Sequence, residues 1–227
     1  MAQSKYFTPD QTSDILYAAG GFDTHLYQFD YTPCLALQFF GACRPSESYN
    51  VQWGNMDFNE NTIKVGKNKF GGDIRMVRMK PNLKNILLPY YERSKGRGSV
   101  LPRELDKKLN PLYQLVRKQI ETKGRAKRSD ELKFEKMFLH VQLTCAQAYG
   151  RIAKRNNIKW IKDGSRHSYG SYRYRELFQH DAPGSGESAK STLKEEMGTS
   201  LSMLNKHYIG AKGLGMKEVE CYFKIGL

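Results

Sequence analysis

Ten consecutive residues at 34–43 read CLALQFFGAC and are almost entirely apolar, and the preceding Thr32-Pro33 is typical of a helix start. A helix that is apolar on every side must be enclosed by other elements of the fold. We therefore expect a buried helix here, with the rest of the chain packed around it. Its carboxyl end carries Arg44-Pro45-Ser46-Glu47 towards the interior, where a charged pair requires a partner or a function.

The composition supports such a core and indicates a partner class. Of the 227 residues, 39% are hydrophobic and 12% aromatic, which is enough to bury a real core and argues against wholesale disorder. The length corresponds to one large or two small domains at about 150 residues per domain. Lys and Arg number 37 against 23 Asp and Glu, a formal charge of +14. Such a basic chain attracts polyanions, so nucleic acid is the leading partner class.

Cysteine spacing and hydropathy exclude several other classes. The four cysteines form no CxxC pair, and none has a histidine at metal-ligand spacing (Cys34, Cys43, Cys145, Cys221). We therefore expect neither a disulfide framework nor a zinc site. The opening MAQSKYFTPDQ lacks the apolar stretch of a secretory signal, and no segment approaches the ~18 apolar residues that span a bilayer. The sequence predicts a soluble protein of a reducing compartment.

Local patterns predict a mostly helical chain with one small sheet. Thr8-Pro9-Asp10 can cap and open a helix over 13–19, which Gly20-Gly21 ends. Short, partly alternating segments between 56 and 79, separated by turn residues, predict a small antiparallel sheet. The other helices are expected at 81–91, at 131–156 as one long or two shorter helices, from near 166, at 191–208 with a break around Gly198, and at 217–225.

Three polar segments interrupt this helical pattern. Residues 92–105 (ERSKGRGSVLPREL) and 123–128 (KGRAKR) are predicted to be basic surface loops. They are either simply solvated or in direct contact with phosphate groups, and the sequence leaves both readings open. Residues 181–188 (DAPGSGES) have the composition of a flexible insertion.

Three distant fragments together resemble the motifs of the tyrosine recombinase (phage integrase) family. The fragment at 42–47, ACRPSE, resembles the segment with that family's first active-site arginine. The fragment at 163–169, DGSRHSY, resembles the segment with its second arginine. The fragment at 197–200, MGTS, followed by His207-Tyr208, resembles the last block, in which a tyrosine follows about ten residues after a glycine. The opening YFTPDQTSDILYAA also resembles the start of the family's catalytic domain, so the resemblance extends from Tyr6 onward.

The resemblance implies an α+β fold, mainly helical, with a small three-stranded antiparallel sheet, and a site-specific DNA recombinase or integrase activity. Arg44 and Arg166 would hold the non-bridging oxygens of a DNA phosphate with paired, always-charged donors. Tyr208 would attack the phosphorus, since neighbouring guanidinium groups favour a phenolate. The product would be a 3′-phosphotyrosyl link that stores the phosphoester energy, so neither ATP, a metal nor any other cofactor is expected.

Other residues take supporting roles by the same resemblance. A lysine between the second and third strands would protonate the leaving 5′ oxygen. Lys69 fits the family spacing best and Lys67 is the runner-up, because Gly71-Gly72 makes the loop length ambiguous. His167 would contact the phosphate or support groups that do, and Glu47 would be the buried carboxylate that orients Arg44.

Two positions depart from the family pattern. Asp163 stands where the family typically has histidine or another proton-bearing group, and an aspartate would repel the phosphate unless it turned away or paired with a cation. Thr199 stands where the family typically has histidine or tryptophan, although it can still donate one hydrogen bond. These departures keep a catalytically impaired DNA-binding relative as the alternative. A basic RNA-binding protein is a third hypothesis, but it gains nothing from Arg44, Arg166 and Tyr208.

The resemblance also sets expectations for organisation and partners. Residues 1–227 are interpreted as a single catalytic domain without the amino-terminal helical domain of full-length relatives, and the excess length between Arg166 and Tyr208 is assigned to the 181–188 insertion. The expected partner is double-stranded DNA, bound weakly and with strong salt dependence. We expect a monomer in free solution and a tetramer on DNA, with helix 217–225 docked on a neighbouring subunit. The expected location is the cytoplasm, at the nucleoid.

Overall fold

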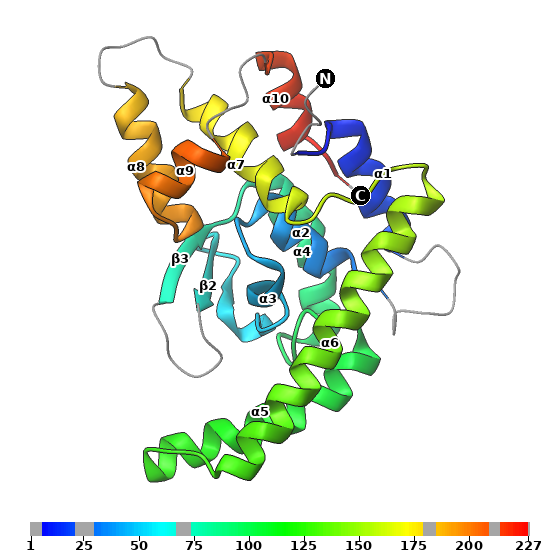
Figure 1. The fold of residues 1–227 in the computed structure, drawn as a ribbon, viewed down its shortest axis with the longest axis vertical. Coiled ribbons are helices and arrows are strands. Elements are labelled where there is room, and N and C mark those ends of the chain that lie inside the picture. Colours follow the sequence, from blue (N-terminus) through cyan, green and yellow to red (C-terminus); the bar gives the residue numbers. More distant parts are fainter. Residues whose placement is uncertain (1–5, 21–29, 67–73, 179–184, 209–213, 227) are drawn as a thin grey trace.

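Helix α2 (Thr32–Phe40) lies at the centre of the molecule, and every one of its residues is buried. The computed structural model describes residues 6–20, 30–66, 74–178, 185–208 and 214–226. Around α2 pack α1 (Pro9–Ala19), α3 (Pro45–Ser48), α4 (Pro81–Ser94) and α7 (Gly164–Leu177), as Figure 1 shows. The predicted buried helix is therefore confirmed, and the turn that follows it is carried into the interior.

Helix α1 begins where the capping residues predict. The Thr8 hydroxyl accepts a hydrogen bond from the Gln11 backbone N–H at 3.2 Å, and the Gln11 side chain accepts one from the Thr8 N–H at 3.1 Å. This reciprocal capping box satisfies two N–H groups that a helix start leaves unpaired. The Phe7 N–H just ahead donates to the Ser168 hydroxyl at 2.9 Å, which fixes this segment against α7.

The sheet has three antiparallel strands in the order β1 (Met56–Asp57), β2 (Thr62–Gly66) and β3 (Ile74–Arg78). Its register pairs Ile63 with Val77 and Val65 with Arg75. Because directly opposed residues share a face, these four side chains lie on the inner face of the sheet. The predicted mainly helical fold with a three-stranded antiparallel sheet is confirmed. The β2–β3 connection, with both candidate lysines, lies outside the described residues.

Helices α5 (Arg103–Lys123) and α6 (Arg128–Arg155) form a long antiparallel pair that projects from the body (Figure 1). The segment predicted as one or two helices over 131–156 is a single helix that begins three residues earlier. Between the two helices, the predicted basic loop is reduced to 124–127.

In the described part of the chain, no helix combines the length and the apolarity that crossing a membrane requires.

The prediction that 92–105 is a surface loop is wrong at both ends and in its middle. Helix α4 continues to Ser94, and α5 begins at Arg103. Val100 and Leu101 are buried, and the Val100 N–H donates to the Val51 carbonyl at 3.2 Å. Because these two apolar residues pack against the core, the exposed part of the loop is the preceding basic stretch with Lys95 and Arg97.

The carboxyl-terminal part contains α8 (Ser185–Met197), α9 (Leu201–His207) and α10 (Met216–Phe223). The break predicted around Gly198 is confirmed, since this glycine has a φ of +56°. Within the predicted insertion, residues 185–188 instead form the first turn of α8, while 181–184 lie outside the described residues. Short polar residues at a helix start explain the difference, because they favour helix N-termini as well as loops.

Helix α10 packs against α1 and α7 of its own chain. Val219 and Tyr222 are buried, the Tyr222 hydroxyl donates to the Phe39 carbonyl at 2.5 Å, and its ring stacks on Tyr172 with centroids 4.0 Å apart. The last predicted helix is thus present, and its apolar residues Val219 and Tyr222 are buried against other helices of the same chain.

Candidate active site

The site begins at the turn between α2 and α3, where Ala42 has a φ of +54°. This turn places Arg44 at the start of α3 with Pro45 at its first position. The Arg44 backbone N–H donates to Glu47 Oε2 at 2.7 Å, and its guanidinium Nη1 donates to Glu47 Oε1 at 2.7 Å. Glu47 is only 3% exposed, whereas the Arg44 side chain is 39% exposed. The structure therefore holds Arg44 from behind and leaves part of its guanidinium accessible.

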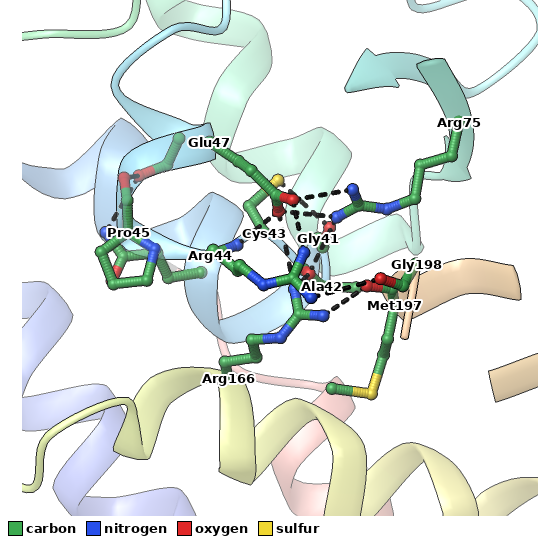
Figure 2. A network of polar contacts seen from close by, with 12 residues as sticks. Gly41, Ala42, Cys43, Arg44, Pro45, Glu47, Arg75, Arg166, Met197 and Gly198 are labelled. Atoms are coloured by element: carbon green, nitrogen blue, oxygen red, sulfur yellow. Dashed lines mark hydrogen bonds and ion pairs between the residues drawn. The ribbon is translucent and has the colours of Figure 1, made fainter. Parts of the chain in front are cut away.

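Arg166 enters from the first turn of α7 and is almost fully buried. Its Nη1 donates to the Ala42 carbonyl and its Nη2 to the Met197 carbonyl at the end of α8, and Nη1 lies 3.6 Å from Glu47 Oε2. Figure 2 shows Arg44 and Arg166 side by side around this carboxylate. Two segments more than 100 positions apart in the sequence thus meet at one point.

A third arginine completes this network. Arg75 reaches in from β3, and its Nη2 and Nη1 donate to the two Glu47 oxygens at 2.8 and 3.1 Å (Figure 2). Burial raises the pKa of Glu47, but hydrogen bonding and charge from Arg75, the Arg44 N–H and the Arg166 charge outweigh it and hold that pKa below its usual value. Three guanidinium groups therefore surround one carboxylate, and the local charge is positive. Such an arrangement attracts an anion.

Tyr208 follows α9 directly and is 8% exposed. Its ring packs on His167, with centroids 4.7 Å apart, and on the backbone of Gly170. Burial and the Arg44 charge lower the pKa of Arg166, while Glu47 and the charge and hydrogen bond of Tyr208 act in the opposite direction. Tyr208 and Arg166 line the same cavity.

These groups share one cavity of about 790 Å³. The predicted residues that line it are Arg44, Asp163, Arg166, His167, Thr199 and Tyr208. Glu47 lies behind the arginines, and Lys69 and Lys67 lie outside the described residues. Six residues from three separate fragments therefore meet, as the resemblance implies.

The two departures from the family pattern also face this cavity. Asp163 is exposed, has a φ of +57° and precedes α7, where its carbonyl accepts the His167 N–H at 2.9 Å. Thr199 is half-buried, and its N–H donates to the Lys194 carbonyl at 3.2 Å. A solvated carboxylate beside the arginines offsets part of their positive potential.

Sequence reasoning missed Arg75. Arg75 lies two and four positions before Val77 and Met79, which are both buried. Because residues two apart in a strand share a face, this spacing indicates that the Arg75 side chain faces inward. Met203 is 44% exposed and lines the cavity with Leu139 and Leu143 of α6. One wall of the cavity is therefore apolar.

The contact between Gly170 and Tyr208 gives a direct test of this packing. A Cβ added at Gly170 would lie 2.6 Å from Tyr208 Cδ1, so Gly170→Ala should push the ring away from His167. We expect a net loss of about 1–3 kcal/mol in the free energy of unfolding, measured by urea denaturation, and loss of the His167–Tyr208 ring contact in NMR spectra. In α6, Gly150→Ala meets no atom within 4 Å and should be neutral or stabilising. Equal behaviour of the two variants would contradict this placement of Tyr208.

Among the residues that the structure describes, no group of three or more His, Cys, Asp or Glu side chains is placed to hold a metal ion. The polar groups that line the described cavity include two guanidinium groups, the phenol of Tyr208, the imidazole of His167 and the hydroxyl of Thr199. These groups can bind an anion and present a nucleophile to it.

Comparison with known proteins identifies a structure of similar fold. No protein-family model matches the chain, and no curated protein matches its sequence. The crystal structure of XerA recombinase is similar, with a TM-score of 0.56 and 15% sequence identity over 95% of this chain. The match covers 62% of the XerA chain, so this protein spans somewhat less than two thirds of that structure. The comparison shows that the chain has a recombinase-like fold.

Proposed function

We propose that this chain cleaves and rejoins DNA as a tyrosine-type site-specific recombinase. The observation that carries the proposal is that Tyr208, Arg166 and Arg44 line one cavity. A phenol and two guanidinium groups, drawn from three segments, converge there. The likeness of the fold to XerA recombinase and the motif resemblance support the same function.

In the proposed reaction, the two arginines bind the non-bridging oxygens of one phosphodiester. The Tyr208 oxygen then forms a bond to phosphorus, and the bond from phosphorus to the 5′ oxygen breaks. Negative charge that develops on the non-bridging oxygens is stabilised by donors already in place. The phenol proton passes to water, and the departing 5′ oxygen takes up a proton, for which Lys69 or Lys67 is the proposed donor. The reverse attack by a 5′ hydroxyl rejoins the strand and releases Tyr208.

The proposed substrate is double-stranded DNA, and the charge distribution fits it. The net charge of +14 favours phosphate backbones, and such binding weakens steeply with salt because bound counterions are released. Assembly of a tetramer on DNA belongs to the same proposal.

The decisive experiment uses nicked suicide DNA duplexes at high concentration, which trap a covalent intermediate without knowledge of the target sequence. We expect a protein–DNA adduct that survives denaturation, with the modified peptide containing Tyr208 when it is mapped by mass spectrometry. A DNA-linked peptide from another part of the chain would refute the assignment of Tyr208. Salt-sensitive DNA binding with no adduct on any duplex would refute the cleavage activity.

The last of these outcomes would support the alternative function, a DNA-binding relative that does not cleave. The exposed carboxylate of Asp163 in the cavity wall favours this alternative, because it repels a phosphate held nearby. Asp163→His separates the two functions. It should increase adduct formation if the carboxylate limits the reaction, and leave it absent if the chain only binds DNA.

A further inference from the structure

Arg75 makes more contacts with the site than either arginine of the clamp, yet it does not line the cavity. Its Nη1 and Nη2 bind both oxygens of Glu47, its Nη2 also donates to the Ala42 carbonyl at 3.2 Å, and its Nε donates to the Glu196 carbonyl at 3.0 Å. The side chain is 11% exposed. Because this nearly buried side chain binds three separate segments of the site, it is placed to hold the site together.

The end of α8 connects this network to the segment that leads to Tyr208. Carbonyls at a helix carboxyl end have no partner within the helix and carry partial negative charge. Arg75 donates to the carbonyl of Glu196, Arg166 to that of Met197, and Arg44 to that of Gly198 at 3.2 Å. Three guanidinium groups therefore bind three consecutive carbonyls. The chain continues from there through α9 to Tyr208.

Of these three arginines, two are the proposed phosphate ligands. A phosphate that enters the cavity competes with the Gly198 and Met197 carbonyls for donors of Arg44 and Arg166. Arg75 faces no such competition, because it lies behind the cavity. Its hold on Glu47 and on the end of α8 therefore persists while the other two arginines exchange partners.

We propose that Arg75 is a positioning residue that aligns the arginine clamp with Tyr208; this role rests on the proposed DNA cleavage. Through Glu47 it orients Arg44 and Arg166, and through the Glu196 carbonyl it anchors the segment that leads to the nucleophile. Arg75 therefore connects β3 both to Glu47 and to the end of α8. A misplacement of about 1 Å in such a site costs about 100-fold in rate.

The test compares Arg75→Met with Arg75→Lys and with Arg78→Met. Arg78 is exposed on the opposite face of the same strand, so its replacement removes the same charge without touching Glu47. We expect Arg75→Met and Arg78→Met to bind DNA with affinities within about threefold of each other, since each loses one cation. Arg75→Met should form the adduct about 100-fold more slowly than Arg78→Met.

A pH profile separates positioning from a general loss of structure. Without Arg75, the burial of Glu47 is less compensated, so the pKa of its carboxyl should rise and the acid limb of the adduct-forming rate should move to higher pH. Arg75→Lys keeps a cation near Glu47 and should restore most of the acid limb, but only part of the rate, because one ammonium cannot reach all four acceptors. An unchanged rate and acid limb in Arg75→Met would overturn the proposal.

A second readout does not depend on activity. The carboxyl carbon of Glu47 can be titrated by NMR in the wild type and in Arg75→Met, together with the ring signals of Tyr208. We expect both the titration midpoint and the Tyr208 signals to shift in Arg75→Met and not in Arg78→Met. If the wild type forms no adduct, the proposed function is refuted. The NMR shifts in Arg75→Met still test whether Arg75 positions Glu47 and Tyr208. If neither shifts, the role of Arg75 fails even in an active protein.

Discussion

Tyr208→Phe should form no denaturant-resistant adduct with any DNA substrate, while it still folds and binds DNA. The substitution removes one oxygen and leaves the ring against His167 and Gly170. The loss of the polar interaction of the hydroxyl in this cavity should cost about 1 kcal/mol of unfolding free energy. Adduct formation on suicide duplexes, DNA affinity at fixed salt and urea denaturation measure the three effects separately.

Tyr174→Phe is the matched control for that experiment. Tyr174 lies on α7, is half-buried and packs against the same small apolar cluster as Tyr208. It does not line the cavity of the two arginines. This variant should form the adduct at the wild-type rate. An adduct in Tyr208→Phe, or its loss in Tyr174→Phe, would remove Tyr208 from the proposed role.

The elements that local signals predicted well are those whose ends and faces are set within a few residues. The capping box of Thr8 and Gln11 fixes the start of α1, and the all-round apolarity of 34–43 requires burial wherever the chain goes. The 92–105 segment was misjudged because its composition is polar, while Val100 and Leu101 are buried by contacts with residues about 50 positions earlier. Burial of that kind depends on tertiary structure.

The same distinction applies to the site. Arg44, Arg166 and Tyr208 could be found because each stands in a short motif, and the structure brings them to one cavity. Arg75 belongs to no such motif, and its role arises only when the inner face of β3 meets α3 and the end of α8. A strand pattern could show that Arg75 faces inward, but not that Glu47 and the Glu196 carbonyl would be there to receive it.

Glu47→Ala should be the most destabilising single substitution at the site. The carboxylate is 3% exposed and lies 2.7, 2.8 and 3.6 Å from Arg44, Arg75 and Arg166. Removing one partner of a buried ion pair costs about 3–5 kcal/mol, because the remaining charge is left uncompensated. That is a large part of the roughly 5–15 kcal/mol that stabilises a typical domain. Urea denaturation should show the loss as a lower midpoint.

Glu121→Ala is the control for burial at equal distance. Glu121 lies 2.7 Å from Arg117, as close as Glu47 is to Arg44, but both side chains of this pair are more than half exposed on α5. Exposed pairs contribute only about 0–1 kcal/mol, so this variant should unfold almost like the wild type. Similar losses for Glu47→Ala and Glu121→Ala would show that the three arginines do not depend on the buried carboxylate.

Glu47→Gln then isolates the charge from the shape, through the dependence of stability on pH. Because the pKa of Glu47 is lower in the folded protein than its ordinary value of 4.5, its ionised form stabilises the fold at pH above about 4.5. This contribution is lost as the pH falls through the lowered folded-state pKa, where the carboxylate becomes protonated among the arginines. Glu47→Gln lacks the charge at every pH, so it should be less stable than the wild type at pH 7 and should converge with it in acid. Equal stability of the two proteins at pH 7 would mean that shape, and not charge, makes Glu47 the centre of this site.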